Sequence, residues 1–314
     1  MVETQLNPTL QSTRTTRTRR FLIIGLALLF FIVLVCTGLS TYVGWSLTHK
    51  EKSLLTSTPA SLGLTFKPIS FKSRTDAFQL KGWFLPAASS NPKNVTIIIA
   101  HGYGKNRMQE DVPGLNVAQG LVQAGYHVLM FDFRASGESE GNLVSVGQYE
   151  QLDLLGAVDW VKANQPGKIG VLGYSMGGST ALLAAAEEPS ISGVIADSPF
   201  NNLKIYLEEN LPVWSHLPAF PFTPLILSIL PPLTGLDPSK VDPLTAVDLI
   251  YPRPILFIHS VDDDTIPYTN SESMWQKHPD KFEFWRTSVA GHVGTYKQQS
   301  TAYIQKLVTF IDKW

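Results

Sequence analysis

A serine framed by two glycines stands where an apolar run meets an alanine-rich stretch. The segment Gly173-Tyr174-Ser175-Met176-Gly177 follows Ile169 to Leu172 and precedes Ser179 to Ala186, which predicts a turn between a buried strand and a helix. The glycines let strand and helix approach closely while the Ser175 hydroxyl projects from the turn. The helix that follows offers partial positive charge and free backbone N–H groups. This arrangement predicts acyl transfer through a covalent serine ester.

Such a serine needs an acid and a base further along the chain. Three consecutive aspartates, Asp262, Asp263 and Asp264, follow an apolar run from Pro254 to Ser260. One of them would orient a histidine by accepting its Nδ1 proton, and the others could cap the helix that begins near Thr269. The residues alone leave the choice among the three open.

The predicted base is His292, which follows an alternating strand from Lys281 to Ser288 and has Gly291 and Gly294 close by. The alternative after the aspartates is His278, which ends a short helical pattern beside Pro279, a position where a solvated histidine is common. Three earlier histidines precede the acid or belong to strands, and we expect them to be structural: His101, His127 and His259.

An oxyanion requires a second hydrogen-bond donor. The apolar run Val95 to Ala100 ends in His101-Gly102-Tyr103-Gly104, a glycine-rich loop. We predict that the backbone N–H groups of Tyr103 and Met176 form the oxyanion hole. The alternative for this loop is a plain glycine turn.

The elements that must position these residues alternate between strand and helix patterns. The parallel strands are predicted at 95–100, 127–133, 168–174, 193–197, 254–260 and 282–287. Helical patterns cover Val146 to Asn164, Ser179 to Glu187 and Thr295 to Asp312. Before them, Leu64 to Lys72 and Phe78 to Pro86 form an antiparallel hairpin. The prediction is an α/β fold with a mostly parallel, doubly wound sheet and ligands at the carboxyl ends of its strands.

An excursion over about residues 201–241 combines apolar bulk with frequent proline. It could be a small lid over the serine, with Trp214, Phe220 and Phe222 lining an apolar substrate pocket or dipping into lipid. The alternative is an irregular segment packed on the core.

These motifs together resemble the α/β-hydrolase superfamily, and within it the serine aminopeptidase-like and Bem46-like hydrolases of bacteria. The resemblance covers about the last 250 residues and rests on five segments: His101 to Gly104, Phe131 to Gly141, Gly173 to Gly177, Asp197 to Phe200, and Gly291-His292. The acid motif of that family, His-Gly-x-x-Asp-x-x-Val-Pro, falls on His259 to Pro267 and implies Asp263 as the acid. Ser260 replaces the usual glycine.

The amino-terminal part predicts a membrane anchor. Residues 21–45 hold no charged side chain, and Arg14, Arg17, Arg19 and Arg20 precede them. The positive-inside rule then predicts a cytoplasmic basic tail at 1–20, a single-pass signal anchor at 21–45, a polar linker at 46–63 and an extracytoplasmic hydrolase domain at 64–314. The alternative is a cleaved signal peptide.

Composition argues against several kinds of site and partner. The only cysteine is Cys36, inside the apolar span, which excludes an intramolecular disulfide and thiolate metal sites. A net charge of −1 argues against a nucleic-acid partner. We expect no cofactor and no metal.

The leading functional expectation is a membrane-anchored serine hydrolase that cleaves a small-molecule or lipid-like carboxylic ester. One alternative is an aminopeptidase-like peptidase that would hold a substrate amine with Glu208 or Glu209, although both fall on a predicted amphipathic helix. Another alternative is a catalytically silent, membrane-tethered binding protein with the same fold.

Overall fold

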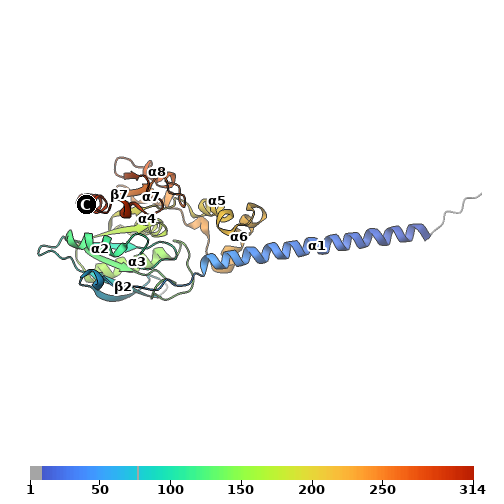
Figure 1. The fold of residues 1–314 in the computed structure, drawn as a ribbon, viewed down its shortest axis with the longest axis horizontal. Helices are drawn as coiled ribbons and strands as arrows, with labels where there is room; N and C mark the ends of the chain where they lie inside the picture. The colour runs from blue at the N-terminus through green and yellow to red at the C-terminus, as the bar shows by residue number, and fades with distance from the viewer. Residues whose placement is uncertain (1–8, 76–77) are drawn as a thin grey trace, which may run out of the picture.

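The computed structural model describes residues 9–75 and 78–314 (Figure 1). Of the predicted basic tail, residues 1–8 and the side chain of Arg14 lie outside the described residues. The helices are α1 Thr9–Thr48, α2 Gly114–Gln123, α3 Glu150–Asn164, α4 Met176–Glu187, α5 Leu203–Ser215, α6 Ala219–Thr234, α7 Pro243–Ile250, α8 Thr269–Trp275, α9 Thr295–Gln298 and α10 Ser300–Ile311, with short 3-10 helices at Pro59–Leu62 and Pro238–Lys240. The strands are β1 Lys67–Lys72, β2 Gln79–Leu85, β3 Val95–Ala100, β4 His127–Phe131, β5 Lys168–Tyr174, β6 Ile191–Asp197, β7 Ile255–Ser260 and β8 Glu283–Thr287.

The strands form one sheet in the order β1-β2-β4-β3-β5-β6-β7-β8. β2 pairs antiparallel with both β1 and β4, and all later neighbours are parallel. The central strands are continuous apolar runs because helices cover both faces of the sheet. The predicted α/β-hydrolase fold, with its mostly parallel sheet and antiparallel start, is confirmed.

Two apolar clusters hold helices against the sheet. On one face, Leu154 of α3 and Leu182 of α4 pack with Phe131 of β4. On the other face, Leu121 of α2 and Leu307 of α10 pack over the same strands. With both faces covered, the carboxyl ends of the strands are the open edge for chemistry.

Besides α4, which begins at Met176 and not at Ser179, two predicted helices have different bounds in the structure. The helical pattern from Val146 begins only at Glu150, because Val146 and Gly147 have positive φ angles of 51° and 113°. The helical pattern predicted from Thr295 divides into α9 and α10 at Gln299, whose φ of −145° and ψ of 57° are not helical. Both differences arise from backbone angles that a periodicity of apolar residues does not report.

Helix α1 extends well beyond the sheet domain and is apolar over most of its length (Figure 1). The stretch Arg17–Thr48 is long and apolar enough to cross a membrane, and residues 17–35 are exposed. The helix continues three residues past the predicted end of the apolar span at Trp45, so its last turn reaches the domain.

The segment predicted as a polar linker, residues 46–63, lies against the domain. Leu55 and Leu62 pack on the apolar cluster under α2, and Nδ2 of Asn106 donates a hydrogen bond to the carbonyl of Leu54 at 3.0 Å. This segment is therefore not a free spacer between α1 and the sheet domain, because its leucines bury apolar surface on the domain.

The insertion after β6 is helical despite its prolines. Asn202 caps α5 by accepting a hydrogen bond from the N–H of Ile205, and α6 contains Pro224, Pro231 and Pro232. α5 and α6 form an apolar cluster of their own together with the end of α1. The predicted lid insertion is therefore a helical unit that packs between the sheet domain and α1, and not the irregular segment of the alternative.

Candidate active site

Ser175 occupies a sharp turn between β5 and α4. Its φ of 52° and ψ of −119° are unusual for a residue with a side chain. The turn is possible because its neighbours are small: a Cβ on Gly173 would lie 2.2 Å from the carbonyl oxygen of Gly177, and one on Gly177 would lie 2.2 Å from that of Ala100. The backbone therefore holds the Ser175 hydroxyl at the open edge of the sheet.

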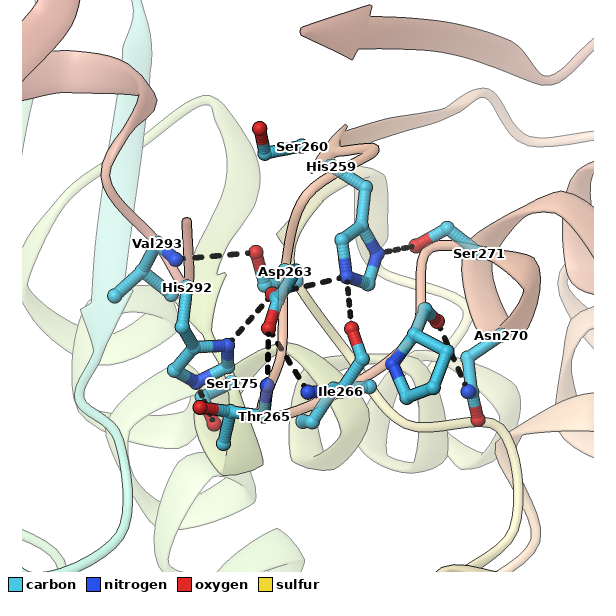
Figure 2. Close-up of polar contacts among 12 residues, drawn as sticks. Ser175, His259, Ser260, Asp263, Thr265, Ile266, Asn270, Ser271, His292 and Val293 are labelled. Carbon is cyan, nitrogen blue, oxygen red and sulfur yellow. Dashed lines mark hydrogen bonds and ion pairs between the residues drawn. The ribbon is translucent and has the colours of Figure 1, made fainter. Parts of the chain in front are cut away.

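Ser175, His292 and Asp263 form one hydrogen-bonded chain (Figure 2). Nε2 of His292 lies 2.9 Å from Oγ of Ser175, and Nδ1 lies 2.8 Å from Oδ2 of Asp263. Because a carboxylate can only accept, Nδ1 carries the proton and Nε2 accepts from the serine. The loops after β5, β7 and β8 thus bring three predicted site residues into the geometry of a nucleophile, a base and an orienting acid.

Asp263 is held as a carboxylate by four donors. Its Oδ1 accepts hydrogen bonds from the N–H groups of Thr265 and Ile266, each at 2.9 Å, and its Oδ2 faces two imidazoles. Burial raises the pKa of Asp263, but hydrogen bonds from His259 and His292 outweigh it and hold the pKa well below its usual range. The group facing His292 is therefore an anion throughout the neutral range.

His259 is the second imidazole on Asp263, and the sequence had suggested only a structural role for it. Its Nε2 lies 3.1 Å from Oδ2 of Asp263 and 2.8 Å from the carbonyl of Ile266. Both are acceptors, so Nε2 carries the proton, and Nδ1 accepts from the hydroxyl of Ser271 at 2.7 Å (Figure 2). The signal available in the sequence was the four-residue spacing between His259 and Asp263, which a tight turn after β7 converts into a contact.

The three consecutive aspartates have three different environments. Oδ1 of Asp262 accepts hydrogen bonds from the hydroxyl of Ser260 and from the N–H groups of Ala290 and Gly291, the latter two at 3.2 and 3.3 Å. Asp262 therefore ties down the loop that carries His292, instead of capping α8 as expected. Asp264 is exposed, and its carboxylate accepts a long hydrogen bond, 3.3 Å, from the hydroxyl of Thr265.

The hydrogen bonds of the other three candidate histidines do not involve Ser175 within the described residues. His278 sits at the surface, where Nε2 lies 2.9 Å from Oδ1 of Asp248 and its ring stacks on Tyr251. His101 is buried and accepts from the N–H of Phe133 at 3.0 Å, and His127 accepts from the N–H of Ala87 at 3.1 Å. Their contacts agree with a structural role.

The loop after β3 presents Tyr103 beside Ser175. Within the described part of the chain, neither the N–H of Tyr103 nor that of Met176 has a hydrogen-bond partner, whereas the neighbouring N–H of Gly102 donates to Gln109 at 2.6 Å. Two free N–H groups next to a serine hydroxyl could bind an oxyanion. Tyr103 also lines the cavity over Ser175, and its hydroxyl donates to the carbonyl of Leu47, another lining residue, at 2.5 Å.

A cavity of about 360 Å³ opens over Ser175 and His292. Of the three side chains predicted to line it, only Trp214 does so. Phe220 is 82% exposed, because the backbone departs from helical angles at this residue (φ −107°, ψ 133°), and Phe222 packs in the cluster of α5, α6 and α1. Loops of the sheet domain supply part of the apolar lining, and further positions of the insertion and of α1 supply the rest: Leu203, Tyr206, Leu207, Leu230, Leu236 and Leu47.

Side chains of both charges line the cavity. Lys50, Lys105 and Asp111 face it, and Nζ of Lys105 lies 3.0 Å from Oδ2 of Asp111. Glu208 and Glu209, predicted as possible amine-binding residues, are exposed on α5 outside the cavity. In the described residues, no three His, Cys, Asp or Glu side chains gather as a metal site would require.

Comparison with known proteins shows the family and the reaction class of the chain. The sequence model of the X-Pro dipeptidyl-peptidase (S15) family matches residues 83–300. The Bacillus subtilis protein YqkD is 33% identical over 239 residues, 75% of this chain and 76% of its own. The lysophosphatidylserine lipase ABHD12 of Xenopus tropicalis is 32% identical over 163 residues, 47% of this chain and 38% of its own.

Among solved structures, the Pyrococcus furiosus esterase Pf2001 superposes with a TM-score of 0.70 and 26% identity, covering 84% of this chain and 99% of its own. Esterase, lipase and peptidase relatives share hydrolysis as their reaction class. The chain is therefore a hydrolase that belongs to the X-Pro dipeptidyl-peptidase (S15) family within the α/β-hydrolase superfamily.

Proposed function

We propose that this chain is a membrane-anchored serine hydrolase of carboxylic esters. The observation that carries the proposal is the chain of hydrogen bonds from Ser175 through His292 to Asp263 beneath an apolar cavity. Ser175 Oγ attacks the ester carbonyl while His292 takes its proton, and the alcohol leaves with that proton. Water then attacks the acyl-enzyme by the same route and releases the acid.

The oxyanion of each tetrahedral intermediate would lie between the N–H groups of Tyr103 and Met176. Both N–H groups lack partners among the described residues, so they need not break a hydrogen bond before they bind the developing charge. The negative charge of Asp263 stabilises the imidazolium that forms on His292.

The membrane anchor is part of this proposal. Its support is the exposed apolar length of α1 and the arginines at 17, 19 and 20 on its amino side. The positive-inside rule places the residues before α1's apolar stretch in the cytoplasm and the hydrolase domain outside.

The S15 match makes a dipeptidyl-peptidase the second candidate. Such an enzyme must bind a protonated substrate amine, and among the described residues that line the cavity only Asp111 offers a carboxylate. Asp111 already pairs with Lys105, and Lys50 adds another positive charge. These charges favour a neutral or anionic ester over an amine.

The test compares the full-length protein with its Ser175→Ala variant on aryl esters of increasing acyl length and on an aminoacyl-proline arylamide. We expect hydrolysis of the esters by the wild type alone. Faster turnover of the arylamide would favour the peptidase, and equal rates for both proteins on every substrate would overturn the serine mechanism.

A further inference from the structure

One face of α1 packs against the insertion. Near its carboxyl end, Ser40, Gly44 and Thr48 are buried and recur every four residues, which places them on one stripe of the helix. This stripe faces α6: a Cβ on Gly44 would lie only 3.4 Å from Cδ2 of Leu230. The absence of a side chain at Gly44 therefore lets the two helices approach closely.

The other faces of the same turns carry exposed aromatic residues. Tyr42 is 70% exposed and Trp45 is 49% exposed, and both follow the exposed apolar stretch of residues 21–35 by about two to three helical turns. Tyrosine and tryptophan gather where a spanning helix leaves the hydrocarbon for the headgroup layer. The part of α1 that contacts α6 is thus the part that would lie at the membrane surface.

The exterior of the insertion is apolar along α6 and at the end of α5, whereas Lys204, Glu208 and Glu209 are exposed earlier in α5. α6 contains no charged residue, and Figure 1 shows it alongside the end of α1. Phe220 of α6 is exposed, as is Val213 of α5 at 64%. Large apolar side chains exposed on helices next to a spanning segment are typical of surfaces that enter the interfacial layer.

The cavity connects this surface with the catalytic serine. Leu47 of α1, Leu230 of α6 and Trp214 of α5 line the same cavity as Ser175. Trp214 is also 41% exposed, so it borders both the cavity and the exterior. The wall of the cavity is therefore built in part from the two helices that would meet the membrane.

We propose that α6 and the end of α5 lie in the headgroup layer of the bilayer, and that the cavity takes its substrate from there. The substrate class is an ester of one long acyl chain, whose chain lies along Leu230 and Leu47 while its carbonyl reaches Ser175. This inference rests on the proposed esterase function for its chemistry, but the membrane contact of α6 can be tested without any reaction.

The first experiment measures depth in the membrane. The full-length protein, with Cys36→Ser to remove its own cysteine, carries a nitrobenzoxadiazole label at Phe220→Cys in nanodiscs of equal parts phosphatidylethanolamine and phosphatidylglycerol. The matched control is Leu249→Cys on α7, where the native side chain is 68% exposed. We expect doxyl-labelled lipids to quench only the first label and aqueous iodide only the second. The same response at both positions would overturn the membrane contact.

The second experiment measures substrate choice in the same nanodiscs. Monopalmitoylglycerol in the bilayer is compared with soluble para-nitrophenyl butyrate. We expect Phe220→Glu to lower the ratio of the palmitoyl rate to the butyryl rate about tenfold, because a carboxylate resists entry into the interfacial layer, and Leu249→Glu to leave the ratio unchanged.

Each outcome separates this inference from the proposed function. Ser175-dependent butyrate hydrolysis without palmitate release, or equal ratios for the two glutamate variants, would overturn the inference alone. Absence of Ser175-dependent turnover of either ester, even after delivery of the esters in detergent, would overturn the esterase function.

Discussion

Nε2 of His259 lies 3.1 Å from the same carboxylate oxygen of Asp263 that accepts the hydrogen bond from His292. One oxygen atom thus accepts from two imidazoles that belong to different strand ends. His259 is itself fixed by the carbonyl of Ile266 and the hydroxyl of Ser271. Because its position is determined on both ring nitrogens, it can act as a rigid support for the acid.

His259 is predicted to be a positioning residue for Asp263. His259→Leu should lower kcat about ten- to a hundredfold with little change in KM, since it removes one charge-assisted hydrogen bond and leaves the cavity intact. His259→Gln, which retains an N–H donor, should recover part of kcat. Steady-state kinetics on a soluble ester would show this split; equal losses in the two variants, or a change confined to KM, would contradict the role.

Asparagine substitutions at the three consecutive aspartates should affect kcat to different extents. Asp263→Asn should lower kcat about a thousandfold or more, because it disturbs the tautomer and the orientation of His292. Asp262→Asn should cost only a few-fold, since it weakens the tie to the 290–291 loop, and Asp264→Asn should be neutral. Kinetic constants of the three variants on one ester decide the order, and losses of similar size would refute Asp263 as the acid.

The backbone and the side chain of Tyr103 have different expected roles. Its backbone N–H is the proposed oxyanion donor, while its hydroxyl bonds to Leu47 at the end of α1. Tyr103→Phe should therefore keep kcat on a short ester within about threefold and lower the free energy of unfolding by about 1 kcal/mol. Kinetics and thermal unfolding in detergent test both parts. A hundredfold fall in kcat would mean that the side chain, and not the backbone, serves the reaction.

Asp197 should make stability depend on pH. Burial raises the pKa of Asp197 to about 6, and a hydrogen bond from Tyr303, 2.8 Å long, offsets only part of that effect. The folded state thus holds this proton more tightly than the unfolded chain does, so the stabilisation is complete below about pH 4 and is lost as pH rises through about 6.

Between about pH 4 and about pH 6, this proton's contribution to the free energy of unfolding falls by about 3 kcal/mol. Urea unfolding of the full chain in detergent, at about pH 5 and about pH 8, should show a smaller difference for Asp197→Asn than for the wild type. If the variant and the wild type change in parallel, another group is responsible.

Local patterns in the sequence are sufficient for the elbow and for the alternation of strands and helices in a mostly parallel sheet. The elbow is a contiguous motif, and Gly173 and Gly177 are required by contacts within the strand–turn–helix unit and with the adjacent strand. The assignment of Asp263 needed a family motif, because three adjacent carboxylates are chemically alike and only the fold distinguishes them. The roles of Asp262 and His259 depend on contacts that the sequence does not report.

The insertion was less predictable. Prolines suggested irregular backbone, yet α6 accommodates Pro224, Pro231 and Pro232 within a helix. Phe220 and Phe222 were expected at the cavity because of their size, but the direction of a side chain depends on the backbone angles at Phe220 and on packing against α1. The attachment of residues 46–63 to the domain likewise depends on surfaces from distant parts of the chain.

The most direct test of the account is covalent labelling of Ser175. The full-length protein in detergent is treated with a fluorophosphonate at neutral pH, and the adduct is located by mass spectrometry, with Ser175→Ala and Asp263→Asn as controls. We predict one adduct on Ser175 in the wild type, none in Ser175→Ala and slow formation in Asp263→Asn. An unlabelled wild-type protein that remains folded, or an adduct on another residue, would contradict Ser175 as an activated nucleophile.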